Sequence, residues 1–403
     1  MSCRAACVAV LCLLAVRASA QSPRPPVFDS RAELVLVDVV VTDEKQQPVL
    51  DLVASDFEVS EDGVPREILS FAAFGAAATR AMAQAAAAGT AAPPQAQFVV
   101  ASTVLLIDEG HLSLKETVAL GPALTQILRG LTERGGWLLV LAPYSNVAFA
   151  GRLPEDAVKL AEAAGHIHGR RTPQLSTFPM TDSEAIDIEL GDTLTAKRVL
   201  SRFAFLNPGM PTQMESLMTM RATELATAAR ARRGGTFGAL RVGLDWLARQ
   251  PGRHSLLLVT SGFPHDPADP LFERVATQSL RANAPIHFLD VASLSAQRPF
   301  ETIEYSRALP QESRVTGFET ADSAAGSERL SLDTGGLRVS GDDRAGLERI
   351  LATTKTYYVL GYDPPRRKKP GFRKIKVEVR GKGLTVLARR GYFDDSPEDS
   401  GGR

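Results

Sequence analysis

The chain has 403 residues, of which 44% are hydrophobic, and its 46 Lys and Arg residues balance 46 Asp and Glu residues. This length predicts about two or three domains with sizeable cores. A formal net charge of zero argues against nucleic acid or an acidic membrane surface as the partner. Cys3, Cys7 and Cys12 all lie near the N-terminus, so the rest of the chain has no disulfide, catalytic thiol or cysteine metal ligand.

Residues 1–20 have the pattern of a signal peptide. Arg4 precedes an apolar run, Ala5–Val16, and the small residues Ala18, Ser19 and Ala20 mark a cleavage site. An uncleaved anchor is the alternative, but the run is short for a membrane span. We therefore expect an exported bacterial protein that is periplasmic, secreted or at the cell surface, with no membrane span after signal removal.

Residues 21–74 are predicted to form a β segment. Glu33–Thr42 is rich in Val and Leu, and Glu61-Asp62-Gly63 is a hairpin signal between two alternating runs. Residues 75–97 are rich in Ala and contain Pro, which is typical of a linker because they offer no large side chain to bury.

Residues 98–354 alternate apolar strands with amphipathic helices. This alternation predicts an α/β domain with a mostly parallel sheet and helices on both faces. The expected strands are Phe98–Asp108, Trp137–Ala142, Val147–Ala150, His254–Thr260 and Ile286–Val291. The expected helices are Lys115–Glu133, Glu155–Ala164, Phe237–Gln250, Pro270–Ala282 and Asp342–Thr354.

Residues 166–233 interrupt this alternation. They contain no strand candidate and are predicted to form a helical insertion of two helices, Asp182–Phe205 and Thr212–Arg233, hinged at Asn207-Pro208-Gly209. Residues 355–395 return to β structure. Because so few strands are unstable alone, we expect this C-terminal segment to pair with the N-terminal one in a single β-sandwich, followed by a disordered tail over 396–403.

Several segments, in this order, resemble those of a von Willebrand factor A (VWA) domain protein, and more closely the VWA-domain proteins of acidobacteria. The residues that carry the resemblance are Val37–Val41, Asp56–Gly63, the apolar run ending at Asp108, Pro251–Leu258, Thr334–Gly336, Tyr357–Tyr362 and Arg390–Tyr392. The resemblance implies a Rossmann-like VWA fold with flanking β segments.

The resemblance also implies a divalent cation, such as Mg²⁺, at the strand tips, held by hard oxygen ligands. Asp108 matches the first acid of the family motif, and Thr236 matches its loop threonine. Gly110 and Leu112 stand where the motif has serines, and Ser261, a weak oxygen donor, stands where it has an acid. Two interpretations stay open: a cation bound by Asp108, Thr236 and Ser261, or a degenerate site in which hydrogen bonds replace the ion.

We expect a non-enzymatic module that binds a protein partner through the strand-tip face. The residues expected on this recognition face are Glu109, Gly110, His111, Ser113, Gly235, Gly262, His265 and Asp266. A structural component of the cell envelope is one alternative. A hydrolase using Ser261, His265 and Asp266 is the other, although a triad needs groups that converge from separate elements.

Overall fold

A computed structural model describes residues 34–45, 47–75, 77, 101–144, 147–171, 178–209, 213–250, 252–294, 324–353, 356–365 and 371–394. The signal peptide, most of the linker and the C-terminal tail predicted above lie outside these ranges. Within the described ranges, no helix combines the length and the apolar character needed to cross a membrane.

The largest sheet has six strands in the order β10-β9-β8-β5-β6-β7. Its strands are parallel except β7, which pairs antiparallel with β6. The bounds are β5 Ala101–Ile107, β6 Gly136–Ala142, β7 Val147–Leu153, β8 Arg253–Thr260, β9 Ile286–Asp290 and β10 Arg338–Ser340. The predicted α/β class with a mostly parallel sheet is confirmed.

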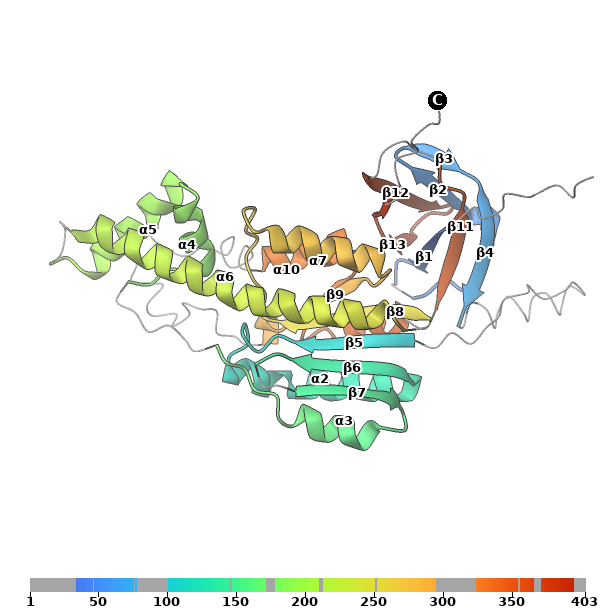
Figure 1. The fold of residues 1–403 in the computed structure, drawn as a ribbon, viewed down its shortest axis with the longest axis horizontal. Helices are drawn as coiled ribbons and strands as arrows, with labels where there is room; N and C mark the ends of the chain where they lie inside the picture. The colour runs from blue at the N-terminus through green and yellow to red at the C-terminus, as the bar shows by residue number, and fades with distance from the viewer. Residues whose placement is uncertain are drawn as a thin grey trace, which may run out of the picture. The chain divides into compact units, whose positions relative to one another are not determined.

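Helices cover both faces of this sheet (Figure 1). One core joins the sheet to α2 Leu114–Arg134, α3 Ala157–Ala164 and α11 Arg344–Thr353. The other core joins it to the C-terminal half of α6 Met214–Leu247, and to α7 Pro270–Arg281 and α10 Ala325–Asp333. Alternate residues of each strand enter opposite cores, as the period of a strand requires: Leu105 lies in the first core and Leu106 in the second.

Two four-stranded antiparallel sheets are built from both ends of the chain. Their orders are β13-β1-β11-β4 and β14-β12-β2-β3. The bounds are β1 Val35–Thr42, β2 Phe57–Glu61, β3 Val64–Arg66, β4 Ile68–Phe74, β11 Tyr357–Tyr362, β12 Gly371–Val379, β13 Thr385–Ala388 and β14 Gly391–Asp394. Strands of the two sheets share one hydrophobic core. The N-terminal and C-terminal β segments therefore form one folded unit, in which β11 lies between β1 and β4.

The helical insertion differs from its predicted form in two ways. The expected helix Asp182–Phe205 is two helices, α4 Asp182–Glu189 and α5 Thr193–Leu206. Gly191 separates them with a φ of 89°, and the Asp192 side chain caps α5. The expected break before residue 237 is also wrong, because α6 is one continuous helix of 34 residues.

The insertion has its own core, in which α4 and α5 pack beside the N-terminal half of α6 (Figure 1). Arg202 of α5 and Glu184 of α4 form a bidentate ion pair inside it, with N–O distances of 2.7 and 2.9 Å. Both side chains are buried. The C-terminal half of α6 belongs to the sheet core, so one helix links the insertion to the sheet.

Candidate functional site

Asp108 lies directly after β5, at the edge of the sheet where parallel strands end. Its neighbour across the sheet is fixed by register: Ile107 pairs with Val259, so the next residues, Asp108 and Thr260, lie side by side. This edge is where open α/β sheets bind ligands. The polar side chains that end β5 and β8 therefore meet at the expected place.

Three donors saturate most of the Asp108 carboxylate. The Thr236 hydroxyl donates to Oδ1 at 2.8 Å, and the Thr260 hydroxyl donates to Oδ2 at 2.9 Å. His111 Nδ1 lies 2.7 Å from Oδ2, and because an ionised carboxylate only accepts, this nitrogen carries the proton. All four side chains are buried. Three of about four acceptor positions on the carboxylate are thus used within the protein.

Thr236 binds Asp108 from the interior of α6. The family resemblance had implied that this threonine lies in a loop. The preceding glycines, Gly234 and Gly235, also lie inside this helix. Gly235 has a packing reason: a Cβ there would lie 2.9 Å from the Tyr144 hydroxyl. A Cβ at Gly110 would similarly lie 2.7 Å from the Tyr144 ring. The Tyr144 ring thus fills the space beside two backbone positions of the site.

Two further carboxylates at this edge bind protein groups. Glu109 is buried, and its side chain accepts hydrogen bonds from the backbone N–H groups of Tyr144 at 2.8 Å and His168 at 3.4 Å. Glu116 forms a capping box with Ser113 at the start of α2. Its other oxygen accepts a 2.7 Å hydrogen bond from the Ser261 hydroxyl.

Asp266 links the loop after β8 to α6. Its carboxylate binds Arg230 at 2.9 Å and Arg233 at 3.0 Å, and Arg233 also binds Asp269 at 2.7 Å. Burial alone would raise the pKa of Asp266, but the hydrogen bonds from the two arginines outweigh it, and the pKa is lowered. Sequence inspection missed these arginines, because an Arg-rich helix end also fits an exposed surface.

The residues present do not fit a divalent cation. Asp108 and Thr236 bind each other, and His111 supplies a third partner through its N–H, which cannot ligate a metal. The hydroxyl of Ser261 is bound to Glu116 in a separate group. In the parts of the chain that the structure covers, no cluster of three or more His, Cys, Asp or Glu side chains is arranged to hold a metal ion.

The expected recognition face is mostly internal. Glu109, Gly110, His111, Gly262 and Asp266 are buried, whereas Ser113, Gly235 and His265 are half-buried. The half-buried members of this face are therefore the ones accessible to a partner in this structure. Glu109 binds backbone N–H groups, His111 binds Asp108, and Asp266 binds two arginines of α6.

The hydrolase residues are not arranged as a triad. The Ser261 hydroxyl binds Glu116, His265 Nε2 lies 3.0 Å from Arg329, and Asp266 binds the α6 arginines. Within the described ranges, no hydrogen bond joins Ser261, His265 and Asp266 to one another. Burial lowers the pKa of His265, and the neighbouring Arg329 lowers it further.

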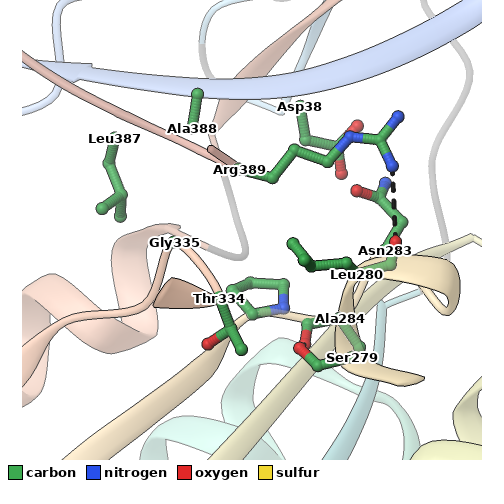
Figure 2. A pocket seen from close by; sticks show the side chains of 11 residues that line it. Asp38, Ser279, Leu280, Asn283, Ala284, Thr334, Gly335, Leu387, Ala388 and Arg389 are labelled. Carbon is green, nitrogen blue, oxygen red and sulfur yellow. Dashed lines mark hydrogen bonds between the residues drawn. The ribbon is translucent and has the colours of Figure 1, made fainter. Parts of the chain in front are cut away.

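A pocket away from this edge lies between β-sandwich residues and the α7 end of the α/β domain (Figure 2). Arg389 crosses it and donates a 3.4 Å hydrogen bond to the Leu280 carbonyl, while Asp38 lines the same space. Its cavity volume is about 20 Å³, which is enough for a water molecule but not for a metabolite.

No family model matches the chain, and no curated protein matches it.

Proposed function

We propose that this chain is an exported, non-enzymatic, VWA-like module that binds a protein partner without a metal ion. The observation that carries this proposal is the saturation of Asp108 by Thr236, Thr260 and His111. In a metal-dependent module a partner's carboxylate completes the coordination of the ion. Here the hydrogen bonds of Asp108 hold the strand ends in place. The side chains that surround this site would then contact the partner.

The half-buried and exposed rim of the strand-tip edge supplies those groups. Tyr144 is 40% exposed, although its ring packs on the two glycines of the site. Arg170 is exposed and donates a 3.4 Å hydrogen bond to the Tyr144 carbonyl. Lys115 is also exposed near the start of α2. These cations favour a partner with acidic side chains.

Partner capture tests the proposal. Residues 21–403 serve as bait for an envelope extract, and the captured protein is then purified and its affinity for the bait measured. Arg170→Glu reverses a rim charge and should weaken binding at least tenfold. Arg129→Glu makes the same change at an exposed position on α2 and should bind like the wild type.

Metal independence is checked in two measurements. In the binding assay, the affinity for the partner should be unchanged by EDTA. In thermal unfolding, the Tm of the chain should not change with Mg²⁺, Mn²⁺ or Ca²⁺. Loss of the partner in EDTA would show that a cation is needed. Equal binding by wild type and Arg170→Glu would show that the partner uses another surface.

A further inference from the structure

The opposite end of the sheet contains a second group of polar side chains. Arg134 is the last residue of α2, three residues after Leu131, which packs in the sheet core. This spacing places the arginine on the same face of the helix, facing inward. It is therefore an inward-facing cation at the N-terminal ends of the strands, far along the sheet from Asp108.

The free edge of this guanidinium has a defined geometry. Nε and Nη2 of Arg134 are both buried, and neither has a hydrogen-bond partner among the described residues. These two nitrogens form the side-on edge of a guanidinium, whose parallel N–H bonds match two oxygens of a carboxylate, phosphate or sulfate. The unpaired atoms are thus the pair that binds an oxyanion bidentately.

His287 supplies a third donor on the same face of the sheet. It is 1% exposed, and its Nδ1 accepts a 3.1 Å hydrogen bond from the Leu337 backbone N–H. In the neutral ring the proton is therefore on Nε2, and this buried nitrogen has no partner within the described ranges. An N–H group buried without an acceptor costs free energy that a bound anion or water would recover.

Two hydroxyl residues lie on the same face of the neighbouring strands. Thr103 pairs with Ser255 across β5 and β8, and Leu257, two residues further along β8, pairs with His287. Thr103, Ser255 and His287 therefore form a diagonal row on the face that α2 covers. Both hydroxyl residues are buried, so this end of the core is polar where the rest is apolar.

The charges around this group are mainly positive. Burial, together with the nearby cations Arg253 and Arg134, lowers the pKa of His287 to about 3. Burial lowers the pKa of Arg134 to about 10, and Glu348 opposes this. Glu348 is exposed and binds Gln126, and no ion pair joins it to Arg134 among the described residues. Arg253 already binds Asp38 at 3.1 Å.

We propose that Arg134 and His287 form a binding site for a small oxyanion at the N-terminal end of the sheet. Arg134 binds two oxygens through Nε and Nη2, and His287 donates from Nε2. The hydroxyls of Thr103 and Ser255 lie on the same face and provide further donors. The site is separate from the strand-tip edge, so it does not depend on the proposed partner.

Thermal unfolding of the full chain in matched ionic strength tests this site. Sodium phosphate, sodium sulfate and sodium acetate are the probes, and sodium chloride is the reference. An oxyanion that binds only the folded protein should raise the Tm by about 3 °C at saturating concentration. Comparison of the three probes distinguishes tetrahedral anions from carboxylates.

Variants separate specific binding from the general effect of salts. Arg134→Met should lose the anion-dependent shift, and Arg134→Lys, which keeps the charge without the bidentate edge, should lose most of it. Arg129→Met on the exposed side of α2 should keep the full shift.

A separate readout follows His287 directly. Its ring NMR signals should titrate at a higher pH with the anion bound, because the anion stabilises the imidazolium. An equal Tm shift in wild type and Arg134→Met, or no shift with any of the three anions, would overturn the proposal and indicate that water alone fills this space.

Discussion

His111 Nδ1 lies 2.7 Å from Oδ2 of Asp108, and both side chains are buried. His111 is three residues from Asp108 in the chain, in the turn that follows β5. The imidazole shares the carboxylate with two hydroxyls, from Thr236 on α6 and Thr260 on β8. The Asp108 side chain therefore links the end of β5 to the end of β8 and to α6.

Replacing His111 by Ala should destabilise the protein by about 1–3 kcal/mol, because it removes a hydrogen bond to a buried carboxylate. The measurement is urea unfolding followed by circular dichroism. Lys115→Ala, at an exposed position on α2, is the control and should change stability by less than about 0.5 kcal/mol. If His111→Ala unfolds at the wild-type urea concentration, the contact contributes little.

Thr236→Val keeps the shape of the side chain but leaves Oδ1 of Asp108 without its hydroxyl donor. We expect a loss of about 1–3 kcal/mol. Thr236→Ser keeps the hydroxyl and should cost less. Unfolding curves of the two variants test this prediction. If Thr236→Ser were less stable than Thr236→Val, the methyl group and not the hydroxyl would contribute the stability.

The ion pair between Arg202 and Glu184 should stabilise the insertion locally. Arg202→Met leaves a buried carboxylate without its bidentate partner, which costs about 3–5 kcal/mol. Amide hydrogen exchange should therefore rise in α4 and α5 more than in the sheet, because the insertion has its own core. The double variant Arg202→Met with Glu184→Gln should recover much of the protection. Uniform exchange across the whole chain would argue against a separate unit.

Stability should fall as the pH falls below about 6.5, in part through His287. Its pKa is about 3 in the folded protein, compared with an ordinary value of 6.5. The unfolded chain therefore binds the proton first, and the stabilisation is present above pH 6.5 and lost toward pH 3. The slope from this group is about 1.4 kcal/mol per pH unit.

The pH prediction is checked with His287→Gln in buffers without phosphate, sulfate or carboxylate. Between pH 6.5 and 5, its free energy of unfolding should depend less steeply on pH than that of the wild type. If the free energy of unfolding depends equally steeply on pH in the two proteins, His287 does not have different pKa values in the folded and unfolded states.

Deleting the chain after Thr353 should unfold the N-terminal β segment. Tyr357–Tyr362 lies between β1 and β4, so its loss leaves both strands without their shared partner. Limited proteolysis should then cleave within residues 34–75. Deletion after Asp394 should leave this segment protected. Protection of the N-terminal segment in the shorter protein would mean that it folds without the C-terminal strands.

The sequence by itself determined the α/β class and the position of Asp108. Continuous apolar runs such as the one ending at Ile107 fix buried strands, since burial on both faces leaves no polar alternation. A single acid after such a run must lie at the strand end. These are local properties of the chain, and they can be identified without knowing what packs against it.

Only the tertiary structure decided how that acid is used. The family resemblance implied that Thr236 lies in a loop, but α6 continues through it, and Gly235 packs against Tyr144. Ser261 was a candidate ligand, but Glu116, 145 positions away, takes its hydroxyl. Both outcomes depend on contacts between distant segments, which no local pattern encodes. The same holds for Arg134 and His287, whose convergence depends on the packing of α2 across the sheet.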